Sequence, residues 1–258
     1  MSKDVTRIHC NHCNKITTVN YLLCITCGNL PKKTDFIKEL TFGRAQLHAE
    51  MYKFNEKIEI LNKIPNDDNP WAEFRNGFLS ISYSALINLE VMIKEPHVYN
   101  NALKQFGRFT NSEKPDSFLP TQDLYNKDSF LTLFLFTIEN FFDNLIRNST
   151  KPKKYTTLYD KTKYLFEILN LGNEQSELFY QVLFPLELRN LLHANGIYNN
   201  SKPFDVTIKK INFKFIPNNI PEYASWIHIC FCFTILMEVI NIIFDHPHFS
   251  RFLPKRDN

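Results

Sequence analysis

The stretch DSFLTLFLFTIENFFDNLIRN (128–148) decides the fold, because it is the clearest helix in the chain. Asp128 or Ser129 can cap its start, since a side-chain oxygen at that position accepts a backbone N–H. The helix is apolar on nearly all sides up to Ile138, and a helix of that kind lies inside a bundle. The sequence therefore predicts a mostly α protein built around residues 128–148.

Helical periodicity continues on both sides of this stretch. Apolar residues recur at three- and four-residue steps, and the segments that we expect to be helical are 34–64, 71–95, 158–172 with Gly172 as the C-cap, 174–196 with a kink or junction at Pro185, and Pro221 to about 244. The segment 96–127 has a weaker pattern, so we expect short helices and loops there. Residues 197–216 are rich in β-branched and aromatic side chains, which predicts a small β-hairpin inserted between two helices.

The composition narrows the classes of function. A chain of 258 residues with 44% apolar residues can bury the core of one large domain, or of a small module attached to a larger one. Its six glycines form neither a GxxxxGK(S/T) nor a GxGxxG motif, which argues against a glycine-rich phosphate-binding loop. The net charge of +3 is compatible with a nucleic-acid partner but does not indicate one.

No secretory signal is expected at the start of the chain, because the first ten residues lack an apolar stretch. The segment 226–244 is long enough to span a bilayer. It carries His228, Glu238 and Asn241, so we interpret it as a buried core helix. Together these observations predict a cytoplasmic protein that makes no contact with a membrane.

Four cysteines form two pairs near the N-terminus, Cys10 with Cys13 and Cys24 with Cys27. Two such pairs provide the four thiolates of a tetrahedral Zn²⁺ site, and a module this short needs the metal to stay folded. A redox pair or unligated thiols are the alternatives. A redox CxxC usually opens a helix in a strand–helix unit, which the residues around these cysteines do not resemble.

The predicted architecture has two parts. A zinc ribbon with structural Zn²⁺ occupies residues 1–31, and a helical domain with the inserted hairpin occupies residues 32–258. A small zinc ribbon can bind nucleic acid, contact a protein partner or serve as a structural lid. The ribbon therefore leaves the function open.

A polar cluster ends the predicted helix 174–196. Arg189 and His193 are four residues apart, so they lie about 40° from each other on one helix face, with Asn190 beside them. A histidine can take the proton from a 2′-hydroxyl or protonate a leaving 5′-oxygen. A guanidinium can hold the scissile phosphate and stabilise its developing charge. Since the 2′-hydroxyl is the nucleophile, this chemistry cleaves RNA without a metal and does not cleave DNA.

The same residues have a simpler structural interpretation. A histidine in the last turn of a helix is favoured by the helix dipole alone. Arg189 could form an ion pair with Glu187 or Glu139, or bind a carbonyl group. Tyr198, which follows the cluster, is expected to pack at the start of the hairpin.

An arginine and a polar residue, followed within a few residues by a histidine at the end of a helix, resemble the signature of the HEPN superfamily. Arg189, Asn190 and His193 match that motif, and Glu139 is similar to a glutamate that the family's earlier helix often carries facing the motif. The resemblance covers about residues 125–245. It implies a HEPN-like bundle and ribonuclease activity in a homodimer, with two motifs facing each other across a cleft. Many members are toxins or effectors of bacterial and phage defence.

The spacing of the motif differs from the family's usual one. Three residues separate Arg189 from His193 here, whereas the family usually has four to six. The difference rotates the histidine by about 100° around the helix. It is compatible with a tighter pair on one face, or with a lineage that binds and no longer cleaves.

Lysines near aromatic residues form two candidate RNA contacts. Lys151, Lys153 and Lys154 lie in a basic loop, and Lys209 and Lys210 lie in the predicted hairpin. Exposed lysines in loops and edge strands are also ordinary solubility features.

Two functions are therefore expected. The first is a metal-independent endoribonuclease of HEPN type, acting on RNA as a bacterial defence or toxin effector. The second is a catalytically inactive HEPN-like module that binds nucleic acid or a protein partner in a defence or regulatory complex. A bundle that serves only for assembly is a third interpretation. The surroundings of Arg189 and His193 decide between them, because a nuclease needs both side chains at one exposed surface.

Overall fold

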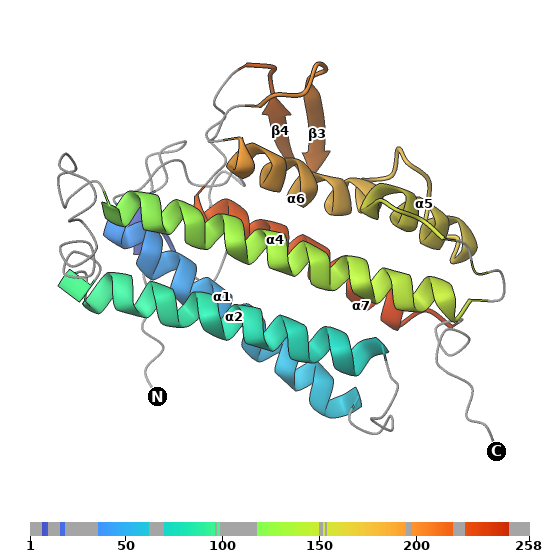
Figure 1. Cartoon of the computed structure of the whole chain (residues 1–258), viewed down its shortest axis with the longest axis horizontal. Helices are drawn as coiled ribbons and strands as arrows, with labels where there is room; N and C mark the ends of the chain where they lie inside the picture. Colours follow the sequence, from blue (N-terminus) through green and yellow to red (C-terminus); the bar gives the residue numbers. More distant parts are fainter. Residues whose placement is uncertain are drawn as a thin grey trace, which may run out of the picture.

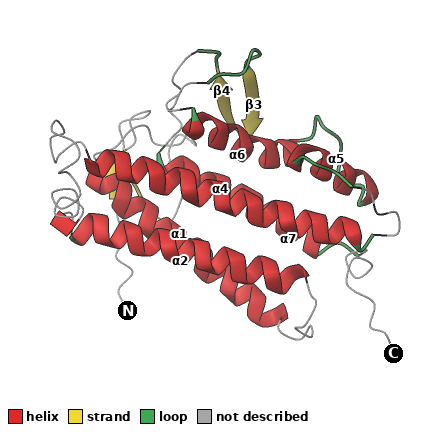
Figure 2. Ribbon diagram, in the orientation of Figure 1, coloured by secondary structure: helices red, strands yellow, loops and turns green. Residues whose placement is uncertain are grey.

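The computed structural model describes residues 7–9, 16–18, 36–61, 70–95, 97–98, 118–149, 152, 154–194, 198–218 and 225–247. Within these residues the protein is mostly helical, as the sequence predicts (Figures 1 and 2). The helices are α1 (Phe36–Leu61), α2 (Pro70–Lys94), α4 (Phe118–Arg147), α5 (Leu158–Ile168), α6 (Glu177–His193) and α7 (Trp226–Phe244). The strands are β1 (Arg7–His9), β2 (Ile16–Thr18), β3 (Phe204–Ile208) and β4 (Ile211–Phe215).

The long helices form a bundle with α4 and α7 at its centre (Figure 1). Helices α1 and α2 pack against each other on one side, α1 also against α7 and α2 against α4. Helices α5 and α6 lie on the other side, where both contact α4 and α6 also contacts α7. The β3–β4 hairpin stands on α6. The hairpin inserted between two helices is thus confirmed, while the HEPN-like character of the bundle stays a prediction.

Phenylalanine rings fill the centre of the bundle where α2, α4 and α7 meet. The ring centroid of Phe233 lies 5.1 Å from that of Phe78 and 5.0 Å from that of Phe134. All three side chains are buried, and Ile242 is the one exposed residue of α7. The apolar composition of α7 is therefore matched by its position in the core, as expected for residues 226–244.

Two of the described helices are long and apolar enough to cross a membrane, Gln122–Arg147 within α4 and Trp226–Phe244. In their most apolar windows, 50% and 72% of the residues are buried inside the protein. Core helices of soluble proteins have the same length and composition. The cytoplasmic localisation therefore stays a prediction.

Helix α4 begins ten residues earlier than the sequence indicates, at Phe118 instead of Asp128. The predicted N-cap at Asp128 or the next residue is wrong, because both lie inside the helix. Pro120 lies in the first turn, where a proline removes no helical hydrogen bond. The first turns of α4 do not show a helical apolar pattern, because two positions of the buried face carry charged residues, Asp123 and Lys127.

Helix α5 ends with Asn170 in the left-handed conformation, at φ 53°. The N–H of Leu171 donates to the carbonyl of Phe166 at 2.9 Å, and the N–H of Asn170 donates to that of Glu167 at 3.2 Å. These two bonds form a Schellman motif, which satisfies the last carbonyls of the helix. The C-cap is Leu169, so the predicted C-cap at Gly172 is wrong by three residues.

Helix α6 carries the hairpin through aromatic packing. It runs through Pro185 as one helix, so a junction at this proline is wrong. The strands are antiparallel, from Phe204 opposite Phe215 to Ile208 opposite Ile211. The ring of Phe184 in α6 lies 4.1 Å from that of Phe213 on β4. Alternate residues of both strands are buried on this side, which fixes the register of the hairpin.

Two lysines form the turn between β3 and β4. Lys209 and Lys210 have φ values of 51° and 66°, and positive φ at both positions is what a type I′ turn requires. Residues with a side chain adopt this conformation at a cost of roughly 1–2 kcal/mol each. The N–H of Lys209 donates to Glu177 Oε1 at 3.0 Å, and its ammonium lies 2.8 Å from Glu238 Oε2. The turn is thus attached to the first turn of α6 and to α7.

The N-terminal strands β1 and β2 pair in antiparallel register, with His9 opposite Ile16. In the sequence, Cys10 and Cys13 lie between these strands. The four cysteines of the predicted zinc site are outside the described residues. The zinc ribbon therefore stays a prediction.

A buried ion cluster, named here the Lys127 cluster, joins α1, α4 and α7. The Lys127 ammonium lies 2.8 Å from Glu39 Oε1 and 2.6 Å from Asp123 Oδ2. At the start of α7, the Trp226 N–H donates to Glu39 at 2.8 Å, and its indole N–H donates to Asp123 at 2.6 Å. The Trp226 side chain packs against Gly43 of α1, where a Cβ would come within 2.6 Å of it. The cluster therefore sets how closely the three helices approach.

Burial and the neighbouring charges together set the pKa values in and beside this cluster. It raises the pKa of Asp123, against the stabilising charge of Lys127. Burial also acts to lower the pKa of Lys127, but Glu39 and Asp123 outweigh it, so that this pKa is raised and the lysine stays charged. Burial and the Lys127 charge lower the pKa of His228 to about 3, so this histidine is neutral at neutral pH.

Replacing Lys127 by methionine should lower the free energy of unfolding by about 3–5 kcal/mol, because two carboxylates then stay buried without a counter-charge. Urea unfolding followed by far-UV circular dichroism measures the loss. Lys53→Met is the matched control, since Lys53 is 65% exposed and pairs with Glu50 at 2.7 Å. It should cost less than about 1 kcal/mol. Similar losses in the two variants would contradict the role given to the Lys127 cluster.

Candidate functional site

His193, in the last turn of α6, lies against the first half of α4. Its Nδ1 atom is 3.3 Å from Asp128 Oδ2, and its Nε2 atom is 3.2 Å from Thr132 Oγ1. Asp128 and Thr132 are four residues apart, so both face α6 from one side of α4. The His193 side chain is 50% exposed. The imidazole is therefore held at both nitrogens and still borders solvent.

The carboxylate of Asp128 gives the imidazole a defined orientation. It can accept an Nδ1–H. The Thr132 hydroxyl, 3.4 Å from Asp128 Oδ1, can donate its proton to that carboxylate or to Nε2, and in the charged ring Nε2 donates to the hydroxyl oxygen. The Thr132 hydroxyl thus occupies the place that a substrate hydroxyl needs. Proton transfer to or from a substrate requires Nε2 to exchange Thr132 for that substrate.

Arg189 lies one turn before His193 and is half-buried. It makes no hydrogen bond or ion pair with any described residue, and its Nε atom is buried without an acceptor. Asn190, the next residue, is exposed. A buried guanidinium nitrogen without an acceptor is unfavourable. No described residue therefore neutralises the Arg189 guanidinium.

The two acids that could neutralise Arg189 are used by other groups. Glu187 Oε2 accepts a hydrogen bond from Asn200 Nδ2 at 2.8 Å. Burial raises the pKa of Glu187, and hydrogen bonds from Tyr198 and Asn200 oppose this effect. Tyr198 is 3% exposed and packs on the hairpin, so its predicted packing role is confirmed.

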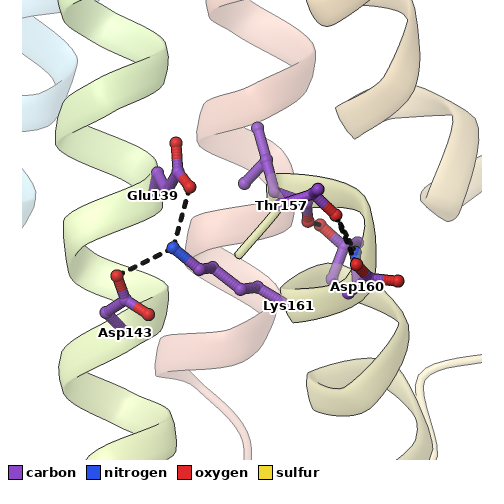
Figure 3. Close-up of polar contacts among 7 residues, drawn as sticks. Glu139, Asp143, Thr157, Asp160 and Lys161 are labelled. Atoms are coloured by element: carbon purple, nitrogen blue, oxygen red, sulfur yellow. Dashed lines mark hydrogen bonds and ion pairs between the residues drawn. The ribbon is translucent and has the colours of Figure 1, made fainter. Parts of the chain in front are cut away.

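Glu139, the other candidate partner, belongs to a separate ion cluster (Figure 3). The buried Lys161 ammonium of α5 lies 2.7 Å from Glu139 Oε1 and 2.8 Å from Asp143 Oδ2. Burial acts to lower the pKa of Lys161, but the two carboxylates outweigh it and raise this pKa. Glu139 is seven residues beyond Thr132, which is roughly 10 Å along the helix axis. The contacts of Glu139 tie α5 to α4 and do not reach His193.

The predicted RNA-binding lysines lie away from His193 wherever the structure describes them. Lys209 contacts Glu177 at the opposite end of α6 from His193, about 24 Å along the helix axis. Lys210 follows it in the exposed turn. Lys154 is exposed and lies beyond the far end of α4. Lys151 and Lys153 lie outside the described residues.

The described residues hold no group of three or more His, Cys, Asp or Glu side chains that could bind a metal ion. Cys230 and Cys232 are buried in α7, where burial raises the pKa of both thiols. A cavity of about 680 Å³ lies at the α5–α6 turn, between Lys163, Glu167 and Glu174 among others. It contains none of the predicted site residues.

Asp128 and Thr132 are the site residues that the sequence reading missed. The sequence predicts Asp128 as a helix cap, and Thr132 is a single polar residue within the apolar segment 130–136. The available signal is their spacing, because two polar residues four apart share one face of a helix. Their partner on α6 becomes evident only when the two helices are placed together.

Asp128→Ala should change the tautomer of neutral His193, because the carboxylate that holds Nδ1–H is removed. The ¹⁵N chemical shifts of the ring should show Nδ1 protonated in the wild type and a shift towards Nε2 in the variant. Asp143→Ala is the matched control, since Asp143 lies on the same helix and pairs with Lys161. An unchanged His193 tautomer in Asp128→Ala would show that Asp128 does not orient the ring.

The comparisons with known proteins add no identity to this site. The chain matches no protein-family model, no curated protein and no solved structure. Its resemblance to the HEPN superfamily therefore rests on the residues of the motif alone.

Proposed function

We propose that the protein is a metal-independent endoribonuclease of HEPN type. His193 transfers the proton, Arg189 binds the scissile phosphate, and Asn190 helps to orient them. The observation that carries the proposal is the unpaired guanidinium of Arg189, one turn from a half-exposed histidine that a carboxylate holds. No described residue supplies an acid or carbonyl partner to this guanidinium.

The proposed reaction uses the ribose of the substrate as the nucleophile. A base removes the 2′-hydroxyl proton, the 2′-oxygen attacks phosphorus, and the bond to the 5′-oxygen breaks as that oxygen gains a proton. The products are a 2′,3′-cyclic phosphate and a 5′-hydroxyl. Arg189 stabilises the charge on the phosphate oxygens during this step. In a homodimer, as the resemblance implies, the second copy of the motif provides the other proton-transfer group.

In this proposed site Asp128, and not Glu139, is the carboxylate that orients the His193 ring. Glu139 pairs with Lys161, whereas Asp128 lies beside the His193 ring. RNA cleavage of this kind fits a cytoplasmic effector of bacterial defence or toxin type. Growth arrest by the expressed wild type, and not by a His193→Ala variant, is the corresponding readout in cells.

A catalytically inactive binding module is the second candidate, and the occupied His193 ring favours it. Asp128 and Thr132 contact both ring nitrogens, so the ring in this arrangement has no free nitrogen for a substrate. Arg189 would then bind a phosphate without its cleavage. The two candidates differ in a single observable, which is whether bound RNA is cut.

His193→Ala and Arg189→Ala should each reduce cleavage of single-stranded RNA about 10²- to 10⁴-fold, because they remove the proton-transfer group and the phosphate contact. Gel analysis of labelled RNA in metal-free buffer measures the rate. His48→Ala and Arg147→Ala are the matched controls, as both residues are exposed on other parts of the bundle. They should cleave like the wild type.

Three outcomes separate the candidates. Equal cleavage by all five proteins, or cleavage of RNA methylated at every 2′-oxygen, would contradict the assigned chemistry. Binding without cleavage by the wild type would support the inactive module. Cleavage that needs His193 and Arg189 but not the control residues supports the endoribonuclease.

For the N-terminal residues we propose a structural Zn²⁺ held by Cys10, Cys13, Cys24 and Cys27, with the ribbon as a contact for a protein partner. The purified protein should contain one zinc ion per chain by elemental analysis, and Cys10→Ser should lower this content sharply. Cys230→Ser is the control, because Cys230 is buried in α7. Wild-type protein free of zinc after purification without chelators would contradict the ribbon.

A further inference from the structure

Two exposed aromatic residues lie on either side of the His193 site along α4. Tyr125 is 62% exposed and Phe136 is 50% exposed. Tyr125 lies three residues before Asp128, and Phe136 lies four residues after Thr132. Each is thus one helical turn from a residue that contacts His193. Their backbones are about 16 Å apart along the helix axis.

Both aromatic residues lie on the side of α4 that borders α6. At 100° per residue, Thr132, Tyr125 and Phe136 are about 40°, 60° and 80° around the helix from Asp128. Thr137, which approaches Gly77 of α2, is about 180° from Asp128. The two rings therefore extend from the edge of α4 that carries the site, and not from the contact with α2.

Arg189 lies towards the Phe136 end of this edge. Helix α4 meets His193 near residues 128–132 and meets Lys161 of α5 near residues 139–143, so α6 runs antiparallel to α4 (Figure 1). One turn back along α6 from His193 corresponds to one turn forward along α4 from Thr132. Arg189 and Phe136 thus lie at about the same level along the bundle.

We propose that Tyr125 and Phe136 are base-stacking residues, which bind the nucleobases on either side of a phosphate held at Arg189 and His193. This inference rests on the proposed action on RNA and narrows the substrate to single strands, because only unpaired and unstacked bases can lie on an aromatic ring. Every base has a π-face, so the contact accepts many sequences.

The pattern of the surface favours RNA over a protein partner. Between Tyr125 and Phe136 along α4, the exposed Ser129 and Leu133 line a pocket against α2, whereas Thr132 contacts His193 of α6. Protein interfaces concentrate their aromatic anchors in one continuous, water-excluding core. Two separated rings on the α6 side of α4, with the Thr132 hydroxyl on that side and Arg189 on the facing helix, instead match the bases, ribose and phosphate of a strand.

The charge of this surface predicts that the affinity for RNA depends only weakly on salt concentration. The exposed residues of α4 from Tyr125 to Asn140 are all uncharged, and the described basic turn at Lys209 lies at the far end of α6. Stacking should therefore provide most of the affinity. For a short oligonucleotide the logarithm of the affinity should fall with a slope near −0.7 against the logarithm of salt, as for one phosphate contact.

The test uses the full chain and a fluorescent single-stranded oligonucleotide whose 2′-oxygens are methylated, so that it binds without being cut. Phe136→Ala and Tyr125→Ala should each weaken its binding about 5- to 100-fold in an anisotropy titration. Phe136→Tyr and Tyr125→Phe should restore it. Tyr52→Ala, at a tyrosine of α1 that is 61% exposed, is the matched control and should bind like the wild type.

Abasic sites in the oligonucleotide identify the contact as base stacking. Removing the base that lies on Phe136 should weaken binding to the wild type and leave the affinity of Phe136→Ala unchanged. The inference is overturned if the alanine variants bind like Tyr52→Ala, if blunt duplex RNA binds equally well, or if the wild type does not bind the oligonucleotide. It is also overturned if the alanine variants change only the oligomeric state.

A separate measurement on unmodified RNA distinguishes this inference from the proposed function. Cleavage that depends on His193 but not on either aromatic residue overturns the stacking role and leaves the endoribonuclease. Stacking without cleavage leaves the aromatic contacts and favours the binding module.

Discussion

The ammonium of Lys127 between the carboxylates of Glu39 and Asp123 brings three helices to one point in the core. An ion group of this kind tolerates little displacement, since a carboxylate that loses its counter-charge away from water is strongly destabilising. Trp226 uses both of its N–H groups on the same carboxylates, which attaches the start of α7 to α1 and α4. The position of α4 relative to the rest of the bundle therefore follows from electrostatics as well as from packing.

The candidate site depends on that position, because α4 contributes half of it. One face of α4 carries the Lys127 cluster and the phenylalanine core, and another carries Asp128 and Thr132 beside α6. On the far side of α6, the ring of Phe184 packs against the hairpin. The middle of α6 is thus held between α4 and the hairpin, while Asp128 and Thr132 contact His193 at its end.

The elements with strong periodicity are predictable from sequence, and those with polar interruptions are not. The helices around residues 34–64 and 71–95 and the hairpin follow from apolar spacing and β-branched content, and the structure confirms them. The start of α4 is missed because Asp123 and Lys127 look like loop residues until they are seen to neutralise each other inside the protein. Asn170 ends α5 by adopting a left-handed backbone conformation. An asparagine is a weaker sequence signal for this conformation than a glycine is.

Of the two helices that form the candidate site, the sequence predicts the residues of α6 but not those of α4. Arg189, Asn190 and His193 share a helix, so their proximity follows from their spacing. Asp128 and Glu139 are both acids on the partner helix, and the choice between them depends on the registration of α6 against α4. That registration is a tertiary property, set by the ion pairs and ring contacts of residues far apart in the sequence.

The dibasic turn of the hairpin has a consequence for proteolysis. Lys209 and Lys210 are exposed and form the kind of sequence that trypsin-like enzymes cut. A protease binds its substrate as an extended strand, whereas these lysines form a two-residue turn with positive φ, attached to Glu177 and Glu238. The native hairpin is therefore shielded by its geometry, and cutting at this turn reports that the hairpin has left α6.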